Sequence, residues 1–126
     1  MTHRETFPAS ERLKSRTMVD RLFKEGASGF VFPLRYMTLT EKSDSPGVEV
    51  LFSVPKKRFK RANKRNTLRR RMRESYRRAK HTLIAKAEAE GVIIRLAFVY
   101  SASEELNYKA IDNAITRILA ECACRP

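Results

Sequence analysis

Positive charge is concentrated in one stretch of this chain, and that stretch most constrains what the chain can fold into. Residues 56–80 hold 14 Lys and Arg side chains and one acid, Glu74, whereas all 126 residues include 27 basic and 14 acidic ones. The net charge of +13 therefore arises in this segment, and the remainder is formally neutral. Charges of one sign repel each other unless a polyanion binds them, so we expect an anionic partner.

The same segment predicts the longest helix. Residues 63–90 contain neither Gly nor Pro, and Gly91 follows as a stop signal. At about 100° per residue, one stripe of this helix is apolar and contains Leu68, Met72, Tyr76, Ala79 and Leu83. The adjoining sector has no acid and contains Asn66, Arg69, Arg70, Arg73, Arg77 and Lys80. We expect the stripe to pack on a sheet and the arginine row to face phosphates.

Two shorter helices are predicted at the two ends of the chain. Ser15 is a candidate N-cap and Gly26 a stop signal for the first, whose apolar positions are Met18, Val19, Leu22 and Phe23. Asn107 is a candidate cap for the last helix. Its apolar face follows the i, i+3, i+4 pattern and contains Ile111, Ala114, Ile115, Ile118 and Leu119.

Strands are expected over residues 30–40, with a break at Pro33, over 48–54 and over 92–100. The turn signals in 41–47 predict an antiparallel hairpin between the first two strands. The order of elements predicts a single α/β (α+β) domain over residues 1–126, with its core over about 12–120. Its architecture would be a two-layer sandwich, one sheet with helices against it.

Several function classes are disfavoured. No apolar run of about 18 residues is present and the start of the chain lacks a signal-peptide core, so we expect a cytoplasmic protein without membrane contact. Cys122 and Cys124 are too close for a disulfide scaffold, and His3 and His81 have no ligand-like spacing to them, so no metal site is expected. We find no nucleophile–base pair, carboxylate cluster or glycine-rich phosphate loop, and expect no catalytic residue.

Residues 65–74, Arg-Asn-Thr-Leu-Arg-Arg-Arg-Met-Arg-Glu, resemble the Arg-Asn-x-x-(Lys/Arg)-Arg-x-x-Arg-Glu signature of the bacterial ribonuclease P protein component. The resemblance spans roughly residues 12–119. Further matches are Arg12-Leu13, Leu22-Phe23 with Gly26, and Val54-Pro55-Lys56-Lys57. It implies an α-β-β-β-α-β-α order with a left-handed crossover at the basic helix, the hand that crossovers rarely take.

The resemblance also implies a function. Family members bind ribonuclease P RNA, which is catalytic, and the 5′ leader of precursor tRNA, and the holoenzyme removes that leader with Mg²⁺ held mainly by the RNA. The chain would be an accessory subunit of this endoribonuclease, monomeric by itself. The expected contacts to the catalytic RNA are Lys56, Lys57, Arg61, Lys64, Arg65, Asn66, Arg69, Arg70, Arg73 and Arg77. The leader is expected in a cleft between the first helix and the sheet, at Arg12, Val19, Phe23 and Tyr36.

Some alternatives stay open at single residues. Asn66 either contacts a base edge or sugar, or hydrogen-bonds locally. Each aromatic side chain near the charge either packs in the core or stacks an unpaired base from an open sheet face; these are Phe23, Phe30, Phe32, Tyr36 and Phe52. Arg65 and Arg69 are expected to face solvent, so that replacing both with Ala would weaken RNA binding and leave the fold intact.

Three other functions compete with this one. A ribosome-associated protein or RNA chaperone would bind RNA without preferring precursor over mature tRNA. A DNA-binding protein would need a dimer or a helix-turn-helix, which the sequence does not show, so no DNA partner is expected. A membrane-surface helix would need a wider apolar face than the stripe through Leu68, Met72 and Tyr76.

Overall fold

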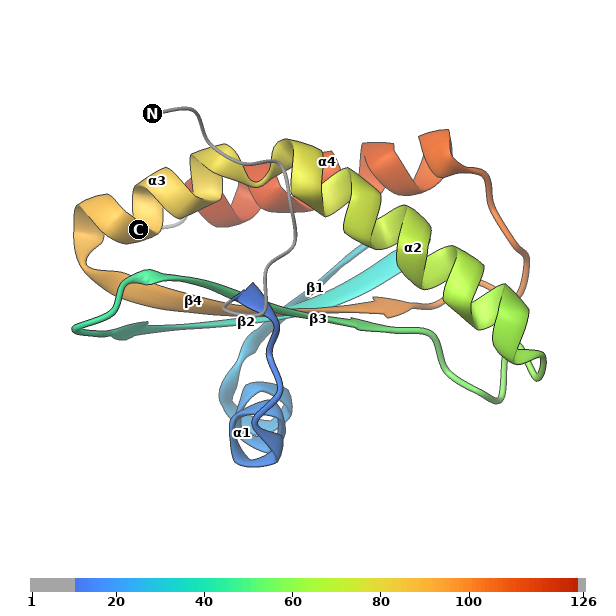
Figure 1. Ribbon diagram of the computed structural model, residues 1–126, viewed down its shortest axis with the longest axis horizontal. Helices are drawn as coiled ribbons and strands as arrows, with labels where there is room; N and C mark the ends of the chain where they lie inside the picture. Colours follow the sequence, from blue (N-terminus) through green and yellow to red (C-terminus); the bar gives the residue numbers. More distant parts are fainter. Residues whose placement is uncertain (1–10, 125–126) are drawn as a thin grey trace.

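The computed structural model describes residues 11–124, and its helices lie on both faces of one four-stranded sheet (Figure 1). Three helices cover one face, and they are α2 (Ala62–Ala79), α3 (His81–Glu90) and α4 (Tyr108–Cys124). Helix α1 (Arg16–Glu25) lies alone against the opposite face. The expected α/β sandwich is confirmed, and α1 adds a partial third layer that leaves much of its face open.

The strands follow the spatial order β1-β2-β4-β3. They are β1 (Ala27–Val31), β2 (Leu34–Lys42), β3 (Gly47–Ser53) and β4 (Val92–Tyr100). The break at Pro33 is confirmed, and it makes the β1–β2 hairpin. The predicted hairpin between the strands of 30–40 and 48–54 is wrong, because β4 lies between β2 and β3.

The composition of β4 explains its central place. Leu96, Ala97 and Phe98 are consecutive, so they point to alternate faces, and each is fully buried. A strand that is apolar on both faces is most stable with a neighbour on each side and cover above and below. β4 accordingly pairs antiparallel with β2 and parallel with β3. A turn signal such as that of 41–47 reports that the chain reverses, but not which strand pairs with which.

The connection from β3 to β4 is a left-handed crossover. In Figure 1 the chain runs to the right along β3, returns to the left through α2 and α3 above the sheet, and runs to the right again along β4, behind β3. A counter-clockwise path that recedes from the viewer is left-handed, against the usual hand of parallel connections. The element order and the crossover that the resemblance implied are both confirmed.

The predicted helix ends are mostly confirmed. Ser15 Oγ accepts from Met18 N at 3.4 Å, Gly26 N donates to Leu22 O at 2.9 Å, and Asn107 Oδ1 accepts from Ala110 N at 3.0 Å. The prediction of a single helix over 63–90 is wrong, because the helix is interrupted at Lys80, between α2 and α3. A non-local contact marks the break: Lys80 Nζ is buried and donates to both carboxylate oxygens of Glu11 at 3.0 Å.

The main core lies between the sheet and the three helices. The predicted inward residues are buried there, namely Leu68, Met72, Tyr76, Leu83, Ile111, Ala114, Ile115, Ile118 and Leu119. Beneath α1 a smaller cluster joins Leu13, Leu22, Met37 and Ala97. The sheet is therefore buried across one face but only locally on the other.

A glycine lets β1 pack closely on β2. Gly29 pairs with Tyr36, and a Cβ added at Gly29 would lie 2.4 Å from Cζ and Oη of the Tyr36 ring. That ring cannot move away easily, since it is buried and its hydroxyl donates to Glu121 Oε2 on α4 at 2.9 Å.

We expect Gly29→Ala to lower the free energy of unfolding by about 1–3 kcal/mol, because the new methyl group overpacks the site. The matched control is Gly47→Ala, since a Cβ at Gly47 would meet nothing within 4 Å. That control should leave stability unchanged or raise it by up to about 1 kcal/mol through the unfolded state. Urea unfolding measures both, and equal midpoints for the two variants would contradict the close approach.

An ion-pair chain crosses the sheet on the side of α1. Arg21 of α1 donates to Glu41 Oε2 at 2.8 Å, Arg95 donates to Glu41 Oε1 at 2.6 Å, and Arg95 also donates to Glu49 Oε1 at 3.0 Å. The hydrogen bond from Arg21, with further help from Arg95, lowers the pKa of Glu41 below its ordinary value of 4.5. These linked ion pairs attach α1 to the sheet.

The lowered pKa of Glu41 predicts how stability depends on pH. The contribution of ionised Glu41 to the free energy of unfolding is fully present above the ordinary carboxyl pKa. It disappears as pH falls through the lower pKa of the folded state. We expect Glu41→Gln to reduce the free energy of unfolding at neutral pH. Between about pH 7 and pH 3 the variant should lose less of that free energy than wild type, as measured by urea unfolding at each pH. Asp44→Asn, at an exposed turn, is the control; an identical pH profile for Glu41→Gln and wild type would refute the prediction.

Candidate nucleic-acid interface

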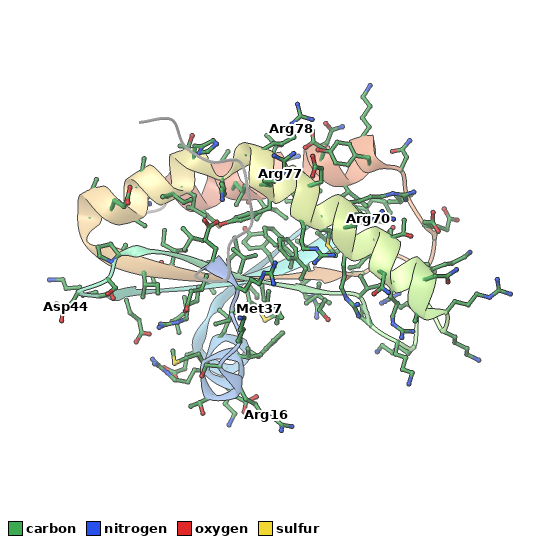
Figure 2. All side chains as sticks on the ribbon, viewed as in Figure 1. Arg16, Met37, Asp44, Arg70, Arg77 and Arg78 are labelled. Carbon is green, nitrogen blue, oxygen red and sulfur yellow. The ribbon has the colours of Figure 1, made fainter. Side chains whose placement is uncertain are left out.

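Helix α2 turns its apolar stripe inward and its arginines outward. Leu68, Met72 and Tyr76 are fully buried, whereas the side chains of Arg70 and Arg73 are exposed and form no hydrogen bond or ion pair with residues 11–124. Figure 2 shows Arg70, Arg77 and Arg78 along the outer side of the helix. The outer surface of α2 can therefore approach a phosphate backbone without first breaking the contacts of Arg70 and Arg73.

Arg65 does not face solvent freely, so that expectation is wrong. Its guanidinium donates to Phe59 O at 2.7 Å and to Lys60 O at 2.9 Å. The Phe59 ring is itself buried, edge to face with Tyr100 at 5.6 Å. Arg65 thus fixes the loop before α2, which we call the basic loop and which comprises residues 55–61. The basic side chains that this loop exposes are Lys56, Lys57, Arg58, Lys60 and Arg61, and Lys64 continues them onto α2.

The structure favours the local interpretation of Asn66. Its Oδ1 accepts from Arg69 at 2.8 Å and so orients that guanidinium. Arg69 and Arg73 line a hollow of about 180 Å³ beside β3, together with Arg12. Arg12 reaches this position because Leu13 N donates to Val50 O at 2.9 Å. The structure therefore groups Arg12 with the α2 arginines rather than with Val19 and Phe23.

Other cations of the predicted row have structural partners. Arg77 pairs with Glu74, and this hydrogen bond lowers the Glu74 pKa. Lys80, which helical geometry placed in the row, is buried against Glu11. Arg71 of α2, which lies outside this row, also has a partner and donates to Leu106 O at 2.7 Å. A helical wheel gives the direction of a side chain but not its partner, and this explains the difference.

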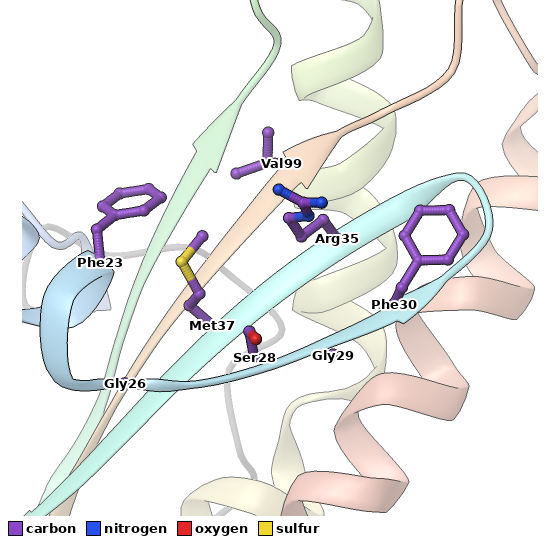
Figure 3. Close-up of a pocket in the computed structure, with 8 residues that line it drawn as sticks. All are labelled: Phe23, Gly26, Ser28, Gly29, Phe30, Arg35, Met37 and Val99. Atoms are coloured by element: carbon purple, nitrogen blue, oxygen red, sulfur yellow. The ribbon is translucent and has the colours of Figure 1, made fainter.

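The open face of the sheet carries a groove of about 640 Å³ (Figure 3). Phe23 of α1 stands at one end and Phe30 of β1 at the other, with Arg35 and Met37 between them on β2. The groove is also lined by Gly26, Ser28, Gly29 and Val99. Phe23 therefore lines a groove between α1 and the sheet. Val19 is half-buried and packs against the small cluster under α1.

Tyr36 does not belong to this surface, and its grouping with Val19 and Phe23 is wrong. It is buried in the main core, on the opposite face of the sheet from α1. Its neighbours Arg35 and Met37 line the groove instead (Figure 3), because successive strand residues alternate between faces. The sequence held a usable signal, since a charged Arg35 belongs on the open face and excludes Tyr36 from it.

The groove continues to the basic loop. Phe30, Arg35 and Val99 also line a second cavity of about 340 Å³, whose other wall includes Lys57 and Arg58. No acid is among the residues that line these two cavities. Acids instead line cavities elsewhere, at Glu25 and Glu90 and at Glu11, Glu49 and Glu88. The two cavities therefore form an acid-free track that joins the groove beside α1 to the basic loop, which leads into α2.

The described residues bear on metal and membrane binding as well. Residues 11–124 bring no three His, Cys, Asp or Glu side chains together as metal ligands. Cys122 is buried and Cys124 is exposed, while His3 lies outside the described residues. None of the described helices is long and apolar enough to span a bilayer.

Comparison with known proteins agrees with the sequence signature. The model of the family described as Ribonuclease P matches residues 7–122. A protein of Porphyromonas gingivalis named ribonuclease P protein component is 34% identical over 126 residues, which cover 98% of this chain and 92% of the relative. The protein of that name in Chlorobium phaeobacteroides is 31% identical over 128 residues, 93% of this chain and 88% of the relative.

Solved structures agree on the fold. The RNase P protein of Staphylococcus aureus superposes with a TM-score of 0.69 at 20% identity, covering 88% of this chain and 94% of that one. The RNase P protein of Thermotoga maritima gives 0.66 at 24% identity, with 88% and 96% covered. The family model and the curated relatives establish the family as well as the fold: the chain belongs to the ribonuclease P protein family.

Proposed function

We propose that this chain is the protein subunit of ribonuclease P and assists removal of the 5′ leader from precursor tRNA. One observation carries the proposal: the acid-free track that joins the groove at Phe23 to the basic loop and α2. Such a track suits two RNA elements held side by side, one on the helix and one in the groove. The names of the relatives support the same assignment.

The surface of α2 and the basic loop would bind the catalytic RNA. Arg70, Arg73, Lys64 and the exposed lysines and arginines of the loop would neutralise phosphates, and Arg69 would do so in the orientation that Asn66 gives it. Arg65 and Arg77 would act mainly by holding the loop and Glu74 in place. Phe23, Arg35 and Met37 would contact the single-stranded leader.

The chemistry is assigned to the RNA. The described residues offer no carboxylate cluster that fits Mg²⁺, so the ion that activates water would be held by RNA phosphates. The protein would reduce repulsion between two polyanions and position the leader, which lowers the concentration of Mg²⁺ needed for cleavage.

The decisive experiment is cleavage of a precursor tRNA by a bacterial ribonuclease P RNA at low Mg²⁺, with and without the protein. We expect efficient cleavage only with both components, and none with protein alone. Binding to RNA without rescue of cleavage, and without preference for precursor over mature tRNA, would favour a general RNA chaperone instead.

The contribution of α2 can be measured through salt. The double variant Arg70→Ala/Arg73→Ala would lose two phosphate contacts. It should bind ribonuclease P RNA more weakly, and the magnitude of its slope of log K against log salt should be smaller by about 1.4 to 1.8. Arg117→Ala removes an exposed arginine on α4, away from the track, and serves as the control. The slope for the control should equal that of wild type, and an unchanged slope in the double variant would contradict the assignment of α2.

A further inference from the structure

The exposed phenylalanines of residues 11–124 lie along one groove. Among the described residues, the large apolar side chains most exposed to solvent are Phe23, Phe30 and Phe32, at 46%, 57% and 63%. The other described phenylalanines, Phe52, Phe59 and Phe98, are buried. Phe23 and Phe30 occupy opposite ends of the groove, and Phe32 lies beside Phe30. Clustered exposed aromatic rings are typical of a binding surface.

Phe30 and Phe32 form a pair at the β1–β2 turn, with ring centroids 6.4 Å apart and ring planes inclined by 64°. Phe30 pairs across the hairpin with Arg35, so both side chains lie on the groove side of the sheet. The turn is anchored to the end of β4, because Ser101 N donates to Pro33 O at 2.8 Å. The two rings are therefore held out to solvent by a fixed backbone.

The surroundings of the pair are cationic. Arg35, Lys57 and Arg58 line the cavity next to Phe30, and none of their side chains forms a hydrogen bond or ion pair within residues 11–124. An apolar protein partner would leave these charges unpaired. A duplex would satisfy the charges but would keep its bases stacked and away from the rings. Unpaired nucleotides satisfy both features, since their phosphates meet the cations and their bases stack on aromatic rings.

We propose that Phe30 and Phe32 are a stacking platform for one or two unpaired bases of the precursor leader, where the leader passes between the groove and the basic loop. The proposal rests on the proposed function and adds a second aromatic contact to that at Phe23. Arg35 and Lys57 would hold the phosphates that flank the stacked bases.

The test combines protein variants with abasic substitutions in the leader. Affinity for precursor tRNA is measured for the complex of protein and ribonuclease P RNA, with each leader nucleotide made abasic in turn. Phe30→Ala/Phe32→Ala should lower affinity by about tenfold for each stacked base and should remove the effect of abasic substitution at one or two leader positions only. Mature tRNA should bind equally well to wild type and variant.

Two further variants separate stacking from loss of apolar surface. Phe30→Tyr/Phe32→Tyr keeps both rings and should retain full affinity, whereas Phe30→Leu/Phe32→Leu keeps apolar side chains and should behave like the alanine variant. All these side chains are exposed, so circular dichroism should show an unchanged fold. Equal affinity of the leucine and tyrosine variants would overturn the platform.

Two other outcomes would also overturn it. A loss that is the same for precursor and mature tRNA would place the pair on the tRNA body, and a change from dimer to monomer in the alanine variant would make it a self-association surface. Failure of the proposed function looks different, because the wild-type complex would then show no preference for precursor tRNA at all.

Discussion

The central position of β4 determines the rest of the architecture. Its two apolar faces require a neighbour on each side, and the parallel neighbour is β3, the strand that precedes it in sequence. Parallel strands need a long connection, and here that connection is α2 and α3. Because the crossover passes over one face, α2 is brought to the β3 edge with its arginines outward, and the opposite face is left for α1 and the groove. The helix surface and the groove thus both follow from one pairing choice.

Electrostatics divides the molecule in a second way. On the α1 side, Glu41 and Glu49 neutralise Arg21 and Arg95, whereas the cavity at Arg35 has Lys57 and Arg58 as its other charged lining residues. Acids are thus placed where cations serve the fold, as with Glu11 at Lys80 and Glu74 at Arg77. Three of the remaining cations, Arg35, Lys57 and Arg58, lie along the acid-free track. A polyanion bound there would reduce their mutual repulsion, and its affinity would depend strongly on salt.

Local patterns predicted the elements well, and non-local contacts account for what they missed. Helix caps at Ser15 and Asn107 and the apolar stripe of α2 depend on neighbours within a few positions, so the sequence contains them. The insertion of β4 between β2 and β3, and the break at Lys80, depend on partners far along the chain. The same limit applies at the site: Arg65 was expected to face solvent, but the carbonyls of Phe59 and Lys60 engage it. The prediction for Tyr36 was wrong for another reason: a shift of one residue along a strand moves a side chain to the opposite face of the sheet.

The basic loop couples the two halves of the interface. Its outer side chains extend the surface of α2, while Lys57 and Arg58 line the second cavity, next to Phe30. Its path is set from within by Phe59 against Tyr100 and from α2 by Arg65. Tyr100 in turn ends β4, and its hydroxyl donates to Glu104 O at 2.6 Å. An RNA bound on α2 would therefore stabilise the same loop that borders the groove. Under the proposed function, the fixed loop would keep the surface of α2 and the groove in register while the catalytic RNA carries out the reaction.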